Sequence, residues 1–152
     1  MLHTIKNDYL QVTVSELGAE LQSIQDCNGT EYLWQGDPKY WKGKAINIFP
    51  YVGRMVNSEY FLDGNRYQLD IHGFARFCRF CPVAADDLHL TLELTDSEDL
   101  LAQFPRKFSF RVIYTLKDNA LEINYQVENR DDKTMYFGLG GHPGFNVPMD
   151  PG

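Results

Sequence analysis

Hydrophobic and polar residues alternate along most of the chain, which is the pattern of β-strands that bury one face. The alternation is strict over residues 88–95, and it recurs over residues 108–116 and 121–127. Residues 117–120 (Lys-Asp-Asn-Ala) form a short joint, rich in turn-forming residues, between the last two runs. These two runs are therefore predicted to pair as an antiparallel hairpin. A shorter run of the same kind covers residues 10–15.

Turn and helix signals complete the predicted fold. Asp63 and Gly64 lie between two short strand-like runs and predict a second hairpin, because an Asp-Gly pair reaches positive φ at low cost. The helical signal is weak: Ser97 can cap a helix of one or two turns, and Pro105 prevents a long continuation. The chain is therefore predicted to be all-β, most simply an antiparallel β-sandwich, with residues 1–152 in a single domain.

Composition narrows the classes of function. The chain has 14 Lys and Arg residues against 21 Asp and Glu residues, and this net charge of −7 argues against a nucleic-acid partner or an anionic membrane surface. No apolar stretch approaches the roughly 18 residues that would span a membrane. The 3 cysteines cannot all pair within one chain, and no secretion signal is evident, so we expect a cytoplasmic protein. Aromatic residues, at 14%, suit strands and also form the flat faces on which sugars and bases stack, so composition alone leaves both roles open.

Three irregular segments interrupt the alternation, at residues 46–56, 72–76 and 138–148. In an otherwise regular β protein, such breaks are where a functional site is expected. All of them combine glycine or proline with a charged or titratable side chain. The polar side chains of interest in these segments are Arg54, His72, Arg76 and His142.

The two histidines are the strongest candidates for chemistry. His142 lies between paired glycines and Pro143, which favour a close approach of a ligand and an extended backbone. An imidazole can act as a general acid near neutral pH because its ordinary pKa is about 6.5. The alternative for both His142 and His72 is a loop histidine that merely satisfies a backbone group.

Other candidates have simpler interpretations. Arg54 can bind paired hydroxyl groups or pair with a carboxylate, and the second is commoner. Arg76 is predicted to be a surface or structural cation. Cys78 and Cys81 have the spacing of a redox or zinc motif, but they lie in a predicted strand and no second pair of ligands has suitable spacing. We therefore predict neither a metal nor a cofactor.

Taken together, these segments resemble the aldose 1-epimerase (galactose mutarotase) family, in particular its LacX-like branch. The resemblance rests on the N-terminal run that ends at residues 17–21, on residues 49–54, the hairpin at 63–64, residues 72–76 and residues 140–146, in this order. It extends over essentially the whole chain. It implies a large antiparallel β-sandwich that interconverts the α and β anomers of a free aldose without metal or cofactor. Because typical galactose mutarotases differ just after His142, the resemblance does not identify the sugar.

The resemblance also implies roles for individual residues. His142 corresponds to the general acid that protonates the ring oxygen, and His72 to the histidine that polarises the sugar near the same oxygen. Arg54 and Asn146 correspond to substrate-binding residues. The general base of the family is a glutamate nearer the C-terminus, for which we find no counterpart before Gly152. We therefore expect the N-terminal portion of a mutarotase-like sandwich, truncated and incomplete as a catalyst.

Two alternatives remain open. The same pocket could serve a carbohydrate-binding or sensing domain that binds a sugar without turning it over. A structural or assembly module could instead use an exposed sheet edge to recruit a partner strand. A sandwich that lacks later strands would leave sheet edges uncovered, so self-association through those edges is also expected.

Overall fold

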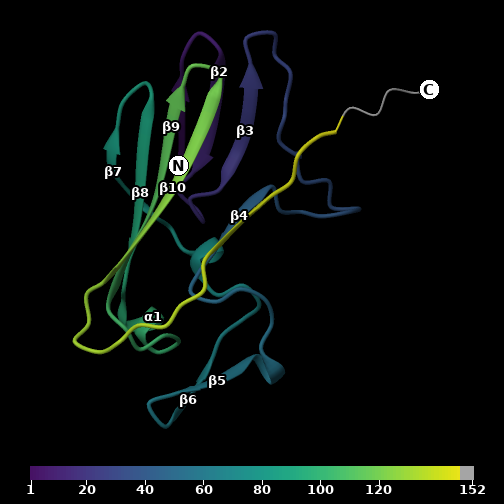
Figure 1. Ribbon diagram of the computed structural model, residues 1–152. Coiled ribbons are helices and arrows are strands. Elements are labelled where there is room, and N and C mark those ends of the chain that lie inside the picture. Colours follow the sequence, from purple (N-terminus) through teal and green to yellow (C-terminus); the bar gives the residue numbers. More distant parts are fainter. Residues whose placement is uncertain (148–152) are drawn as a thin grey trace.

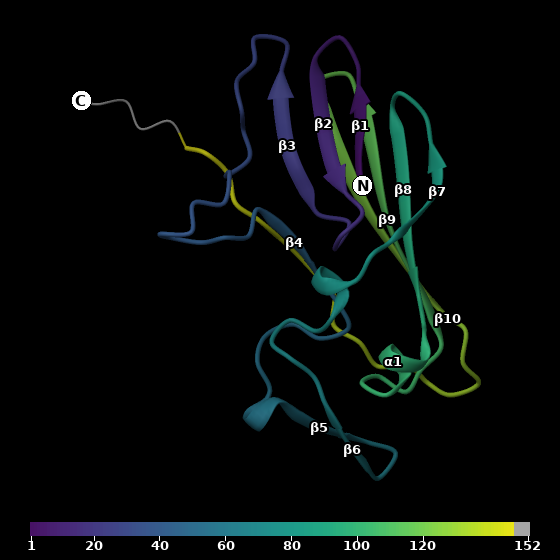
Figure 2. The same cartoon turned by 180° about the vertical axis from the view of Figure 1, so that it is seen from behind.

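The computed structural model describes residues 1–147 and contains two antiparallel sheets that face each other across the main core (Figures 1 and 2). One sheet has three strands in the order β1-β2-β3, and the other has four in the order β10-β9-β8-β7. The predicted all-β, antiparallel sandwich is confirmed. Pro148, the last residue of the third irregular segment, lies outside the described residues.

The elements have the following bounds. The three-stranded sheet consists of β1 (Leu2–Lys6), β2 (Leu10–Ser15) and β3 (Leu21–Asp26). The four-stranded sheet consists of β7 (Cys81–Ala85), β8 (His89–Thr95), β9 (Phe108–Lys117) and β10 (Ala120–Asn129). The remaining pairs are β4 (Ala45–Ile48) with β11 (Gly140–Pro143), and β5 (Glu59–Leu62) with β6 (Asn65–Gln68). The short helices are η1 (Val56–Ser58), η2 (Ala75–Phe77) and α1 (Glu98–Leu101).

The alternation in the sequence decides which side chains enter the core. In β8 every second residue is buried, because successive side chains of a strand point to opposite faces. β9 contributes large aromatic rings, and Phe108 and Phe110 are both fully buried. The ring of Phe110 stacks on that of Phe49, with centroids 4.8 Å apart, so the end of β4 is packed directly onto the core. This packing anchors the segment that precedes Arg54.

The predicted hairpins and helix cap are confirmed. β9 and β10 pair in register from Lys117 opposite Ala120. In the β5–β6 turn, Asp63 has φ 51° and Gly64 has φ 78°, the positive values that a two-residue hairpin turn requires. α1 begins after Ser97, whose hydroxyl oxygen accepts a hydrogen bond from the backbone N–H of Leu100 at 3.3 Å.

The prediction of a strand over residues 78–81 was wrong. Cys78 ends η2, and only Cys81 belongs to β7. The intervening Phe80 is fully buried and donates its backbone N–H to the carbonyl of Glu16 at 2.8 Å, so tertiary packing sets this segment. The cysteines in residues 1–147 form no disulfide. No helix in the same range is long and apolar enough to cross a membrane.

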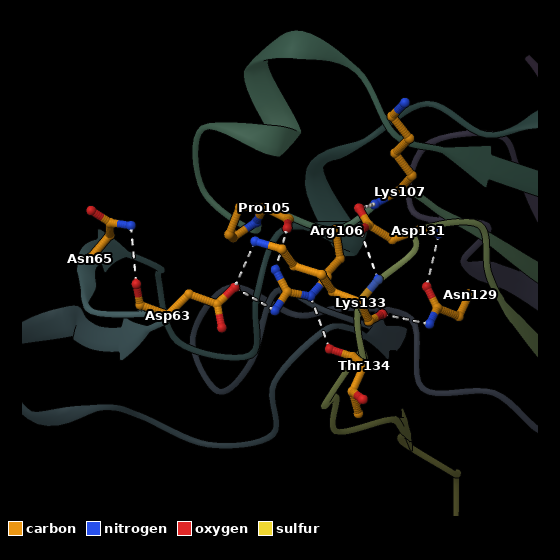
Figure 3. A network of polar contacts seen from close by, with 9 residues as sticks. All are labelled: Asp63, Asn65, Pro105, Arg106, Lys107, Asn129, Asp131, Lys133 and Thr134. Carbon is orange, nitrogen blue, oxygen red and sulfur yellow. Dashed lines mark hydrogen bonds and ion pairs between the residues drawn. The ribbon is translucent and has the colours of Figure 1, made fainter.

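The β5–β6 hairpin projects from one end of the molecule and is fastened by the buried Arg106 (Figures 1 and 3). One guanidinium N–H of Arg106 donates to Asp63 in the hairpin turn at 2.9 Å, and its Nε–H donates to the carbonyl of Thr134 at 2.9 Å. Lys133 also approaches Asp63, at 3.4 Å. The network therefore ties the hairpin to the loop that connects β10 with β11.

One edge of the sandwich is uncovered. β10 is the end strand of its sheet, and no further strand pairs with its outer edge within residues 1–147. A groove of about 570 Å³ lies between β10 and β3, and it is lined in part by Ile24, Leu121, Ile123 and Phe145. An unpaired strand beside an apolar groove is a surface on which another chain can pair. Self-association through this edge stays a prediction.

Candidate active site

His72 and His142 are far apart in the sequence, and the structure brings their rings together. The ring centroids are 6.1 Å apart and the ring planes are inclined by 53°. His142 lies on β11, which pairs with β4, and His72 lies between β6 and η2. The two histidines therefore face a common region built on the β4–β11 pair.

The segment that carries His72 is fixed to the end of β4. The carbonyl oxygen of Phe49 accepts hydrogen bonds from the N–H groups of Phe74 and Ala75, at 3.1 Å and 3.2 Å. Gly73 has φ 73°, and a Cβ at this position would collide with the Phe49 carbonyl. Glycine is required here because the two backbones lie so close. This contact, between residues distant in the sequence, determines where His72 lies.

A hydrogen bond from Gly53 fixes the tautomer of the His72 ring. Its Nδ1 accepts the backbone N–H of Gly53 at 3.1 Å, so the neutral ring carries its proton on Nε2. Burial lowers the pKa of His72, and the positive charges of Arg76, His142 and Arg54 lower it further. His72 is thus suited to remain neutral and to donate a hydrogen bond from Nε2.

The surroundings of His142 are different. Its side chain is exposed, and in the part of the chain that the structure describes neither ring nitrogen has a hydrogen-bond partner. Trp41, in the loop between β3 and β4, packs against the ring with centroids 5.0 Å apart. Both nitrogens of His142 are therefore available to a ligand, whereas only one nitrogen of His72 is.

A buried hydrogen-bond network centred on Asn47 stabilises the β4–β11 pair. Asn47 lies opposite Gly141 in the β4–β11 ladder and is 2% exposed. Its amide donates to the carbonyls of Gly18 and Ala19 at 3.0 Å and 2.8 Å, and its Oδ1 accepts the hydroxyl of Tyr125 at 2.9 Å. The network connects the β2–β3 turn and Tyr125 on β10 to the β4–β11 pair, which carries His142.

The arginines of the irregular segments lie near His72. Arg54 is exposed and lines one end of an apolar groove of about 800 Å³ between the β5–β6 hairpin and residues 136–138. Arg76 is partly buried, so it is not a simple surface cation. Its guanidinium lies 4.4 Å from the centre of the Phe77 ring, and its Nε is buried without a hydrogen-bond partner in residues 1–147. Both arginines add positive charge beside His72.

Asn146 has a clear structural task. Its amide donates to the backbone carbonyls of Glu31 and Leu33 at 2.9 Å and 3.0 Å. Its own N–H donates to the carbonyl of Tyr32 at 2.9 Å. These bonds hold the segment after β11 against the segment after β3. The predicted contact of Asn146 with a sugar stays a prediction.

The side chains around His72 and His142 can form hydrogen bonds with a neutral, oxygen-rich ligand. Imidazole and guanidinium groups are suited to sugar hydroxyl and ring oxygens. Within residues 1–147 no carboxylate forms a hydrogen bond or ion pair with His72 or His142. The same residues contain no group of three or more His, Cys, Asp or Glu side chains arranged to hold a metal ion.

The fold is that of the galactose mutarotase-like β-sandwich proteins. The sequence matches the aldose 1-epimerase family over residues 1–151, and the chain belongs to that family. The resemblance carried by the irregular segments is thereby confirmed. Among curated proteins, the chain is 35% identical to Protein LacX (plasmid) of Lactococcus lactis subsp. lactis, over 97% of this chain and 52% of that protein.

Solved structures agree with this assignment. The chain superposes on a galactose mutarotase related enzyme from Lactobacillus acidophilus with a TM-score of 0.97 and 44% identity, covering 100% of this chain and 51% of that one. A galactose mutarotase-like protein from Lactobacillus casei gives a TM-score of 0.95 at 35% identity, with 99% and 52% covered. The chain spans about half the length of the relatives it matches.

Proposed function

We propose that this chain supplies the two-histidine part of an aldose 1-epimerase, which interconverts the α and β anomers of a free aldose by acid/base ring opening. The observation that supports it most is the proximity of His72 and His142, whose ring centroids are 6.1 Å apart. Membership of the aldose 1-epimerase family and the mutarotase-like fold support the same proposal.

The proposed chemistry consists of two proton transfers. Ring opening breaks the bond between the anomeric carbon and the ring oxygen, the ring oxygen gains a proton, and the anomeric hydroxyl loses one as it becomes a carbonyl. His142, in its protonated form, gives its proton to the ring oxygen. His72 donates a hydrogen bond from Nε2 to the same region of the sugar. The open-chain aldehyde then turns about the C1–C2 single bond, and the hydroxyl that was the ring oxygen attacks the other face of the carbonyl carbon. That hydroxyl returns its proton to His142 and the new anomeric oxygen regains one, which gives the other anomer.

The proposal also needs residues that bind the sugar and a general base that accepts the second proton. Arg54 and Asn146 bind sugar hydroxyls. The group that accepts the proton of the anomeric hydroxyl is, by the resemblance, a glutamate in a part of the family beyond the residues matched here. Neither proton transfer requires a metal or a cofactor. We place the reaction in the cytoplasm, in line with the cysteine usage of the chain.

Mutarotation of freshly dissolved α-D-glucose and α-D-galactose, followed by optical rotation or by the anomeric NMR signals, tests the proposal. Water can accept the proton of the anomeric hydroxyl in place of the glutamate, so we expect a weak acceleration by the wild-type chain. This acceleration should fall about 100-fold in His142→Ala, the typical size of a lost general acid. His89→Ala is the matched control, because His89 lies on the exposed face of β8 with Asp86 as its partner at 2.9 Å. Equal acceleration by wild type and His142→Ala would contradict the proposal.

A second function has one observation in its favour, the lack of a carboxylate partner for either histidine within residues 1–147. A site with imidazoles and an arginine but no base would bind a sugar without turning it over. Saturable shifts of the histidine NMR signals, with no change in the rate of mutarotation, would favour this binding domain over the enzyme.

A further inference from the structure

Trp41 adds a third ring to the histidine pair, and nothing in the sequence pattern pointed to it. Its ring lies 5.0 Å from that of His142, centroid to centroid, and the His142 ring lies 6.1 Å from that of His72. The planes of Trp41 and His142 are inclined by 55°. Trp41 belongs to the loop between β3 and β4, so a third segment of the chain contributes a ring beside the two histidines.

The indole of Trp41 is held in place by its surroundings. A Cβ on Gly43 would lie 2.5 Å from Cζ2 of the indole, and a Cβ on Gly144 would lie 3.1 Å from Cζ3. Both glycines therefore leave the space that the indole needs. Trp34 donates its indole N–H to the carbonyl of Trp41 at 2.9 Å, and its backbone N–H to the carbonyl of Gly144 at 3.0 Å. The β3–β4 loop and the residue after β11 thus pack against the indole and fix its position.

His142, by contrast, has no hydrogen bond of its own within residues 1–147 that would fix its ring. An exposed side chain without a partner samples several rotamers. The indole is a neighbour that can restrict it, because the two ring centroids are 5.0 Å apart, within the range of aromatic pair contacts. The position of the His142 ring relative to His72 therefore depends on Trp41.

We propose that Trp41 is a positioning residue, which holds the imidazole of His142 at the distance from His72 that a sugar oxygen must bridge. The catalytic consequence rests on the proposed function, whereas the restraint on His142 does not. Displacement of a catalytic group by about 1 Å can cost roughly 100-fold in rate. Since the sugar also contacts other groups, loss of Trp41 should lower kcat more than it raises KM.

The experiment compares wild type with Trp41→Leu and Trp41→Phe. Removal of the indole removes both its ring current and its restraint, so the Cε1–H signal of His142 should move and change in width in Trp41→Leu. The signals of His3 and His89 should stay in place. Mutarotation should slow at least about 10-fold, with kcat the main contributor, and Trp41→Phe should restore most of it because a ring remains. Tyr9→Leu, an exposed aromatic in the β1–β2 turn, is the control.

The outcomes separate this inference from the proposed function. An unchanged His142 signal in Trp41→Leu overturns the positioning role, and so does full mutarotation activity in that variant. If wild type neither binds sugar nor accelerates mutarotation, the proposed function fails. The width of the His142 signal then decides whether Trp41 restrains the ring, because loss of the ring current alone would move the signal without changing its width. Should Trp41→Leu not fold, Trp41→Phe decides: the smaller ring leaves the contact incomplete, so a smaller change in the His142 signal is expected, and an unchanged signal overturns the positioning role.

Discussion

His72 and Gly53 exchange two hydrogen bonds: the backbone N–H of His72 donates to the carbonyl of Gly53 at 2.9 Å, and the backbone N–H of Gly53 donates to Nδ1 of His72 at 3.1 Å. The exchange leaves Nε2 as the donor of the neutral ring. It also places Arg54, the next residue along the chain, beside the histidine. One backbone contact thus sets the tautomer of His72 and brings a cation to it.

His72→Asn separates the structural role of His72 from its proposed chemical role. The backbone of His72 has φ 67°, a conformation that asparagine adopts more readily than most residues. The amide oxygen of asparagine can replace Nδ1 as the acceptor for Gly53, so we expect stability within about 1 kcal/mol of wild type. The donor at Nε2 is lost, and mutarotation should fall about 100-fold. Urea unfolding and anomer exchange by NMR measure the two effects; a large loss of stability would contradict the proposed replacement.

The lowered pKa of His72 makes stability depend on pH. Its ordinary pKa is 6.5, and burial together with the nearby charges lowers the pKa in the folded state. Below about pH 6.5 the unfolded chain therefore binds a proton that the folded chain does not, and the free energy of unfolding falls as the pH is lowered towards the folded pKa. Above that window the full contribution is present. Urea unfolding from pH 7.5 to pH 5 should show a decline in wild type that is smaller in His72→Asn. Parallel declines would contradict this origin.

Asn47 is expected to be important for stability. Asn47→Ala leaves the carbonyls of Gly18 and Ala19 and the hydroxyl of Tyr125 with fewer partners in a buried setting, so unfolding should be easier by about 3 kcal/mol. Tyr125→Phe removes a single hydrogen bond of the same network and should cost about 1 kcal/mol. Urea denaturation of both variants provides the comparison. Equal costs would show that the network is not centred on Asn47.

Gly73 and Gly29 offer a matched pair. Both have positive φ, 73° and 83°, but only a Cβ at Gly73 would meet the Phe49 carbonyl, since nothing lies within 4 Å of a Cβ at Gly29. Gly29→Ala should therefore cost about 1 kcal/mol of backbone strain, and Gly73→Ala about 3 kcal/mol or more, because the Phe49 contact must open. Thermal unfolding compares the two. If they cost the same, the close contact does not hold the His72 segment.

The strands and turns could be predicted from the sequence because they depend on the hydrophobic alternation and turn residues of short segments. The alternation in β8 and the turn at Asp63 and Gly64 each depend on a few neighbouring residues, and the structure confirms both. Residues 78–81 were mispredicted because Phe80 packs in the core beside Phe110 and its backbone bonds to Glu16, contacts that no local pattern reveals.

The candidate site was predictable only in part, because the contacts that form it join residues far apart in the sequence. The glycine- and proline-rich breaks indicated His72 and His142, but their proximity depends on the pairing of β4 with β11, which are remote in sequence. Asn47 lies in the irregular segment at residues 46–56, and only its position between Ile46 and Ile48 signalled burial. Trp41 lies outside the irregular segments altogether, and its role comes from tertiary packing.

The central claim is that His72 and His142 bind one sugar together, and a sugar titration followed through the histidine side-chain NMR signals tests it most directly. His3 and His89 are internal controls, since they are held by Glu16 at 3.1 Å and by Asp86 at 2.9 Å. We predict that the Cε1–H signals of His72 and His142 shift with the same dissociation constant while those of His3 and His89 do not move. Shifts of only one ring of the pair, two different dissociation constants, or equal shifts of all four histidines would contradict a shared site.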